Sequence, residues 1–263
     1  FHTNSLLQHW DAPVEIIEEL FDLSPEEIEK IPTSGDEVST LTTKSIEDSL
    51  LHHKSYLAQV FLLDMFLDIL IEHLQEQHLW ENSTFLLTST NGFAFGEHGH
   101  FGTKPLRLFQ EQTHLPLICV SPNNRHVGQH ICTLTQSEVL LAELERWKQT
   151  AQNGRAEPAY EQASAKNVPT VVVDRLPGQP YLILENKEEV ALRTEYWYLK
   201  QPKDDSKADQ AELYLKPDDH WEANDVADRC PEQLALLQQF LGTVLLQGDK
   251  KVPLPQLITE RLV

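Results

Sequence analysis

The chain has 263 residues, of which 40% are hydrophobic, so it can bury a core and is not an intrinsically disordered protein. Its 41 acidic residues outnumber the 21 basic residues, and the resulting net charge of -20 argues against binding to nucleic acid or to anionic membranes. The three cysteines, Cys119, Cys132 and Cys230, show no CxxC spacing and predict neither a disulfide framework nor a zinc site.

The N-terminal part of the chain predicts one long helix. The chain opens as FHTNSLL, where apolar residues begin at once, and we interpret it as a fragment or processed product that starts inside a folded domain. Residues 14–50 are acidic and turn-rich, which predicts a surface excursion with short helices. Residues 53–78 predict a helix because one apolar stripe recurs at steps of four and three: Tyr56, Val60, Leu63, Leu67, Leu70 and Leu74.

Two short apolar runs follow the predicted helix. Residues 83–89 (STFLLTS) predict a buried strand that enters a glycine-rich loop, and residues 115–120 (LPLICV) predict a second buried strand. Helix, strand, loop and strand in this order predict an α/β unit with a parallel or mixed sheet. Ligands of such sheets bind beyond the carboxyl ends of the strands, so the loop at 88–104 (TSTNGFAFGEHGHFGTK) is the candidate site.

The C-terminal part predicts a second, smaller domain. Residues 149–167 are polar and weakly patterned, and we place the domain boundary there, between domains at 1–150 and 165–263. Beyond the boundary, short β-rich runs such as YLILE, VALRT and ELYLK predict a small antiparallel sheet. A helix is expected to begin at Pro231. The second domain is therefore a predicted α+β domain.

Several motifs in order resemble the late core of the sulfatase family, within the alkaline-phosphatase-like superfamily. The stretch YLAQVFLLDMFLDILIEHLQEQHLWENSTFLLTSTNGFAFGEHGHFG is similar to a family helix, a strand, a T-S-D-N-G turn and a G-E-H-G motif. AELYLKPDDHWEANDVADRCPE is similar to the family's closing sheet, and WDAP is similar to a divergent bacterial subgroup. The resemblance implies an α/β fold: a partial alkaline-phosphatase-like core with a mixed sheet flanked by helices, plus the small C-terminal antiparallel sheet and helix.

The resemblance also implies a chemistry, sulfuric ester hydrolysis. In the family, a formylglycine made from the Cys or Ser of a C-x-P-S-R motif attacks the sulfate ester. A calcium ion polarises the sulfate and is held by two early aspartates together with the Asp and Asn of the late motif. The sequence contains neither the C-x-P-S-R motif nor the early aspartates, and CVSPNNR at Cys119 departs from the motif, so we expect Cys119 to be structural.

The same resemblance identifies one candidate metal ligand. Asn91 matches the second position of the family's D-N-G pair, whereas Thr90 stands where the ligand Asp should be. Calcium prefers carboxylate and amide oxygens, so a neutral hydroxyl at this position predicts weak calcium binding. A plain turn is the alternative, because Asn-Gly after a strand is a standard turn signal.

There are three catalytic candidates, of which Lys104 and His2 follow from the resemblance and His98 from its place in the loop, and each has a simpler alternative. Lys104 corresponds loosely to the lysine that contacts the sulfate and the leaving oxygen, and a solvated surface charge is the alternative. His2 corresponds to a mid-chain histidine that contacts the sulfate, and a core histidine is the alternative. His98 would titrate near neutral pH if exposed, but it and Glu97 could instead hydrogen-bond the loop backbone and fix its shape.

The sequence thus predicts a sulfatase-family protein, either a fragment or a degenerate member that lacks the nucleophile and the full metal site. We expect this chain alone to be inactive. The alternatives are a non-catalytic binding or scaffold protein that keeps the fold, and a phosphoesterase of the same superfamily. The expected partners are a small sulfated or other anionic ester and the upstream half of the same protein.

Overall fold

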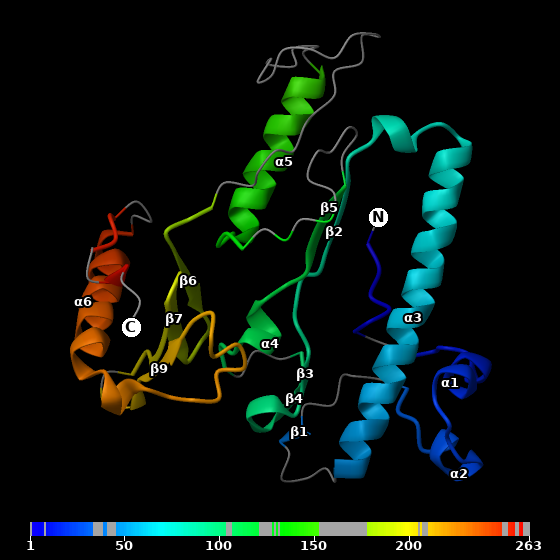
Figure 1. Cartoon of the computed structure of the whole chain (residues 1–263), viewed down its shortest axis with the longest axis horizontal. Helices are drawn as coiled ribbons and strands as arrows, with labels where there is room; N and C mark the ends of the chain where they lie inside the picture. Colours follow the sequence, from blue (N-terminus) through cyan, green and yellow to red (C-terminus); the bar gives the residue numbers. More distant parts are fainter. Residues whose placement is uncertain are drawn as a thin grey trace. The chain divides into compact units, whose positions relative to one another are not determined.

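The computed structural model forms two compact units, each described here by itself (Figure 1). Unit 1 comprises Phe1–Pro105 and Glu111–Cys119, and unit 2 comprises Leu106–Gln110 and Val120–Val263. The predicted domains at 1–150 and 165–263 stay a prediction, because most of the polar stretch between them lies outside the described residues. The structure describes residues 2–7, 9–33, 39–40, 46–103, 107–120, 128, 130, 132–152, 178–204, 206, 210–248, 252–255 and 258–259.

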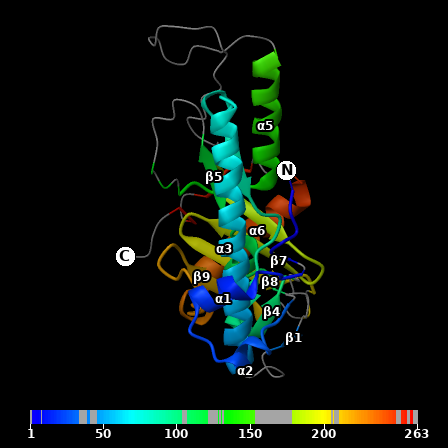
Figure 2. The same cartoon turned by 90° about the vertical axis from the view of Figure 1, so that its right-hand side faces the viewer.

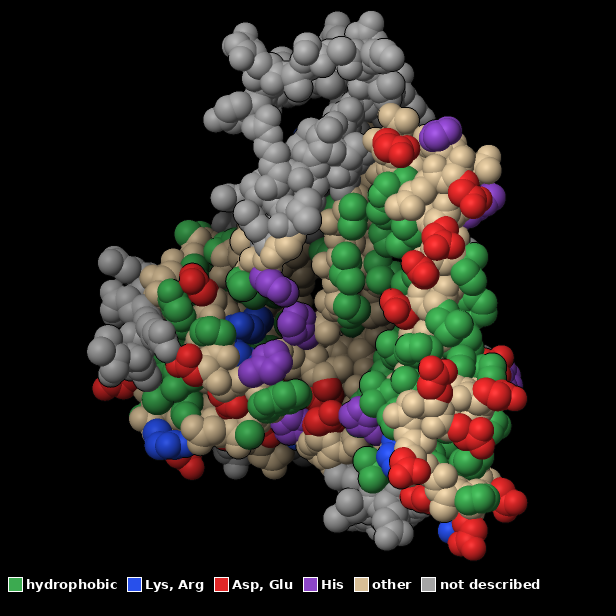
Figure 3. Space-filling model, turned by 45° about the vertical axis from the view of Figure 1, so that its right-hand side comes forward, with side chains coloured by type: hydrophobic (Ala, Val, Ile, Leu, Met, Phe, Trp, Pro, Cys, Tyr) green, Lys and Arg blue, Asp and Glu red, His purple; other side chains and the backbone are tan. Residues whose placement is uncertain are grey.

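Unit 1 is built around one long helix, α3 (Ile46–Glu76), which confirms the predicted helix but begins seven residues earlier than expected (Figure 1). Two short helices precede it, α1 (Val14–Leu20) and α2 (Pro25–Ile28), and α1 packs against α3 (Figure 2). Acidic side chains are spread over the face of the molecule drawn in Figure 3, in keeping with the net charge. None of the helices in the described residues is long and apolar enough to cross a membrane.

Unit 1 also contains two small sheets. Strands β2 (Phe85–Thr88) and β5 (Leu117–Val120) form a two-stranded sheet, which confirms both predicted strands. The prediction that they are buried is wrong, because their side chains are half-buried or exposed in this chain. The second sheet is antiparallel, with the strand order β1-β4-β3. Its strands are β1 (Ser39–Thr40), β4 (His100–Gly102) and β3 (Ala94–Phe95), and the short helices nearby are Trp80–Asn82, Glu97–Gly99 and α4 (Gln110–Thr113).

Unit 2 contains a four-stranded antiparallel sheet with the order β6-β7-β8-β9, which confirms the sheet predicted for the C-terminal part. Pro231 begins helix α6, as predicted. The elements of unit 2 are α5 (Ser137–Gln152), β6 (Tyr181–Glu185), β7 (Glu189–Thr194), β8 (Trp197–Pro202), β9 (Glu212–Leu215), the short helix Ala227–Arg229 and α6 (Pro231–Gln247).

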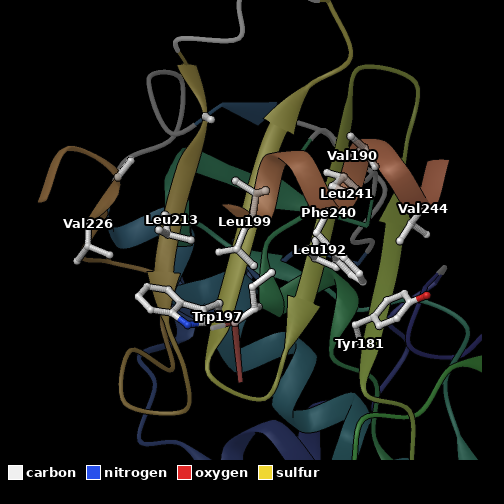
Figure 4. Packing of buried hydrophobic residues seen from close by; sticks show 14 residues of the cluster. Tyr181, Val190, Leu192, Trp197, Leu199, Leu213, Val226, Phe240, Leu241 and Val244 are labelled. Carbon is white, nitrogen blue, oxygen red and sulfur yellow. The ribbon is translucent and has the colours of Figure 1, made fainter. Parts of the chain in front are cut away.

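Side chains of the four-stranded sheet alternate between two apolar layers, because successive residues of a strand point to opposite faces. One layer packs with Leu237, Phe240 and Leu241 of α6, and it includes Trp197 and Leu199 of β8 (Figure 4). The other layer contains Ala191, Tyr198 and Tyr214, and it packs against Leu108 and Phe109. Residues 108–109 are therefore part of the core of unit 2, although they lie only four residues beyond the candidate loop in sequence.

Candidate functional site

The candidate loop leaves β2 and turns at Gly92, where another part of unit 1 approaches closely. The Gly92 amide donates a hydrogen bond to the carbonyl oxygen of Gln112 at 3.2 Å. A Cβ atom at Gly92 would lie 2.1 Å from the carbonyl oxygen of Glu111 and 2.6 Å from the Cα atom of Gln112. Only glycine fits this position without moving backbone, so the Asn-Gly pair is held against α4 and is more than a free surface turn.

Two polar side chains fix the middle of the loop. The Glu97 carboxylate accepts a hydrogen bond from the Phe95 amide, which confirms its predicted role in holding the loop's shape. His98 has a left-handed backbone with a φ of 38°, a strained conformation for a residue other than glycine. Its Nδ1 atom lies 2.9 Å from Oε1 of Glu111, and both side chains are largely buried. His98 thus contacts a carboxylate that the sequence did not associate with it.

An aromatic cluster attaches the loop to α3. Phe93 and Phe95 pack with their rings tilted by 35° and their centroids 4.6 Å apart, and Phe95 meets Tyr56 edge-on at 4.9 Å. Phe101 meets His52 edge-on at 4.8 Å. Such pairs prefer these offset and edge-to-face geometries and bury large apolar areas. Burial in this cluster also raises the pKa of Tyr56 above its ordinary value.

Gln59 holds the N-terminal WDAP segment against the same helix. Its side-chain oxygen accepts hydrogen bonds from the backbone amides of Asp11 and Ala12, both at 3.1 Å. Its side-chain nitrogen donates to Oδ1 of Asp11 at 3.2 Å. Gln59 is almost fully buried, and sequence reasoning missed it. A glutamine adjoining the predicted apolar stripe of the helix was the available signal, since a buried amide requires partners.

The sequence-predicted site residues that the structure describes are His2, Asn91 and His98. Asn91 is exposed, and its side-chain nitrogen donates to Oγ1 of Thr90 at 3.4 Å. His2 is exposed, and Lys104 lies outside the described residues. His98 contacts Glu111, as described above. Which of these residues meet a substrate therefore stays a prediction.

The residues of the loop do not fit a calcium ion by themselves. Thr90 and Asn91 offer neutral oxygens, whereas calcium sites in proteins use several oxygens that include carboxylates. The two nearby carboxylates, Glu97 and Glu111, bind the Phe95 amide and His98. In the described part of the chain, no group of three or more His, Cys, Asp or Glu side chains could hold a metal ion.

A second polar cluster, in unit 2, holds the segment that follows the loop. Arg107 donates to Glu189 and to Glu212, with both nitrogen–oxygen distances at 2.7 Å. Glu212 also accepts from the buried Lys200 at 3.0 Å, and the Lys200 ammonium lies over the Phe109 ring. Burial lowers the pKa of Lys200. Burial raises the pKa of Glu212, but Lys200 and Arg107 outweigh it and hold that pKa below its ordinary value.

A buried ion pair fixes the end of the same segment. Lys216 and Glu222 are both almost fully buried and lie 2.9 Å apart. The Glu222 carboxylate accepts from the backbone amide of Gln110 at 3.0 Å, and Lys216 donates to the side-chain oxygen of Gln110 at 2.8 Å. Burial lowers the pKa of Lys216 and raises that of Glu222. The arrangement is a set of fixed supports for residues 107–110, and sequence reasoning missed it.

Gly92→Ala tests whether the loop depends on its close approach to α4. The added methyl group would meet the Glu111 carbonyl oxygen, and we expect it to lower the free energy of unfolding by about 1–3 kcal/mol, as overpacking does. Urea denaturation followed by tryptophan fluorescence measures the change. Gly242→Ala is the matched control: it has open space in the middle of α6 and should stabilise the protein by about 0.5–1 kcal/mol. Equal effects of the two substitutions would contradict the close approach.

Glu212→Gln tests the support of the Arg107–Gln110 segment. Because Lys200 and Arg107 hold the pKa of Glu212 below 4.5, its stabilising contribution is complete above that pH and is lost as the pH falls through the folded-state value. We expect the substitution to cost about 3 kcal/mol at pH 7, since it leaves Lys200 buried without its carboxylate. The cost should shrink in urea titrations toward pH 3.

Glu185→Gln is the matched control for that experiment. Glu185 forms an ion pair with Lys203 at 3.1 Å on the surface, where such pairs contribute less than about 1 kcal/mol. A cost of Glu212→Gln that equals the cost of Glu185→Gln, or that stays constant with pH, would contradict the support role.

Comparison with known proteins finds a family match for part of the chain and a similar fold in solved structures. The family model described as Sulfatase matches residues 23–146. The structure of the putative sulfatase yidJ from Bacteroides fragilis is similar over 93% of this chain and 51% of that chain, with a TM-score of 0.62 and 19% identity. The structure of BT4656 in complex with its substrate, D-glucosamine-2-N,6-O-disulfate, covers 76% of this chain and 42% of that chain, with a TM-score of 0.55 and 19% identity.

The chain spans about half of the length of these solved structures, or less. No curated protein sequence shows a significant match to it. The family match and the shared fold confirm the resemblance that the motifs predicted. Residues 23–146 therefore match the sulfatase family model, and the chain has a partial alkaline-phosphatase-like α/β fold.

Proposed function

We propose that these 263 residues form the late part of a sulfatase-type core. In this proposal they shape one wall of a pocket for a small sulfated ester and are not a sulfuric ester hydrolase by themselves. The family match and the fold support the pocket, because the loop at 88–103 is held by α4, by α3 and by its own Glu97. The C-x-P-S-R nucleophile motif, which the family uses, is absent from the sequence.

The proposal rests on one observation, the pair Thr90–Asn91 at the tip of the loop. The Asn91 amide is hydrogen-bonded to the Thr90 hydroxyl, in the place where the family pairs an Asn with an Asp. A hydroxyl carries no charge, so it cannot replace the attraction of a carboxylate for a divalent cation. In this proposal the loop takes the place of the late metal-site loop of a sulfatase, and Thr90 and Asn91 supply no anionic ligand at this position.

A second candidate function is favoured by the same pair. A binding or scaffold protein that keeps the sulfatase fold would retain the loop and have no need of the ligand Asp or the nucleophile. The two functions differ in whether turnover appears once the rest of the core is present. A phosphoesterase of the same superfamily is the third possibility, and a phosphate monoester substrate separates it from the first.

Calcium titration tests the proposed loss of the metal ligand. We expect calorimetry to detect no micromolar calcium binding by residues 1–263, because Asn91 and Thr90 provide two neutral oxygens. Asn91→Ala should give the same result. Micromolar binding that Asn91→Ala abolishes would contradict the proposal. Aryl sulfate hydrolysis is recorded on the same samples, and we expect none. Turnover that Lys104→Ala abolishes would show that the chain is an active hydrolase.

A further inference from the structure

The second half of α3 is apolar around most of its circumference, yet none of its side chains is buried. From residue 60 to residue 74, every side chain is half-buried or exposed, whereas the first half of the helix buries Leu51, Ala58 and Gln59. Phe66 and Ile69 are each 60% exposed. In Figure 3, apolar side chains gather between the acidic ones on the side where α3 lies. The exposed large apolar side chains of this half are Val60, Phe61, Met65, Phe66 and Ile69.

A helix of this composition is normally covered by other parts of a protein. Helices that are apolar on nearly all sides occur in the interior of large proteins, because water contacts with so much apolar surface are unfavourable. Single exposed apolar residues need no explanation, but contiguous ones mark a surface that binds another part of a protein. The acidic residues that interrupt the run, Asp64, Asp68 and Glu72, are four residues apart and therefore lie along one side of the helix, so they leave the remaining sides apolar.

The two-stranded sheet β2–β5 shows the same property independently. Leu117 and Ile118 are neighbours in β5, so they point to opposite faces of the sheet, and both are exposed. Strands that are apolar on both faces are typical of sheets covered on both sides. In the described part of the chain each of the two strands has one partner, and a sheet of two strands is marginally stable alone.

We propose that residues 60–74 of α3 and the β2–β5 sheet are docking surfaces for the other half of the sulfatase-type core, encoded upstream of Phe1 in the same polypeptide. That half adds strands to the β2–β5 sheet and covers the apolar side chains of α3. The comparison supports this occupant: 93% of this chain aligns with the putative sulfatase yidJ but covers 51% of it, so about half of that fold has no counterpart here. The identity of the occupant rests on the proposed function.

The test compares residues 1–263 with the product extended upstream in the same reading frame. In the chain of 263 residues, Phe66→Lys should lower the fluorescence of the apolar dye ANS about twofold and reduce self-association in light scattering, because it breaks the exposed apolar surface. In the extended product the same substitution should lower the Tm by about 5 °C or more, because it buries an ammonium group. A docking surface is therefore identified by a substitution that improves the solution behaviour of the shorter chain but destabilises the extended product. An ordinary exposed patch would leave the Tm of the extended product unchanged.

Leu246→Lys is the matched control. Leu246 is 90% exposed on α6 of unit 2, so its substitution should leave the Tm of both products nearly unchanged. An extended product whose Tm does not respond to Phe66→Lys would overturn the proposal. A discrete dimer of residues 1–263 that Phe66→Lys dissociates, and that persists in the extended product, would assign the surface to a second copy. A gene without coding sequence upstream of Phe1 would also overturn the proposed docking surface.

Turnover separates this proposal from the proposed function. Aryl sulfate hydrolysis by the extended product is measured beside the Tm. A lowered Tm without turnover supports the docking surface and favours the binding or scaffold function. Turnover together with a Tm that Phe66→Lys does not change overturns the docking surface and supports the sulfatase function.

Discussion

The attachment of the segment Arg107–Gln110 to the four-stranded sheet is the constraint on which unit 2 depends. This segment covers the face of the sheet that α6 does not cover, and carboxylates on the sheet and on its last turn hold both of its ends. Because Lys200, Lys216 and Glu222 are almost fully buried, removing the partner of any of them leaves a buried charge without its counterion, which is strongly destabilising. The chain passes from unit 1 into this segment and back again.

Within unit 1, the shape of the candidate loop and its charge have separate origins. Its shape comes from the close approach of Gly92 to α4, from Glu97 and from aromatic packing on α3. None of these contacts involves the side chain of Thr90. A single residue can therefore remove the anionic ligand while the loop keeps its form, and a fold comparison alone cannot distinguish an active site from one that has lost its metal.

The sequence predicted what local patterns determine. Apolar periodicity predicted α3 and the antiparallel sheet, and Pro231 marked the start of α6. The burial of β2 and β5 was predicted wrongly, because burial depends on neighbours that the strands themselves do not specify. The ion pairs of unit 2 could not be predicted, since Arg107 and Glu189 are 82 residues apart and Gln110 and Glu222 are 112 apart. The role of Lys104 is still a prediction that rests on motif position.

We propose that the loop at 88–103 corresponds to a sulfatase metal-site loop that lacks one charge. Restoring that charge tests the proposal most directly. Terbium luminescence, with calcium as the competitor, would compare Thr90→Asp with the wild-type chain. We expect Thr90→Asp to bind calcium at least about tenfold more tightly, because ligand charge sets affinity for a hard cation. Equal calcium affinities for the two chains would contradict it.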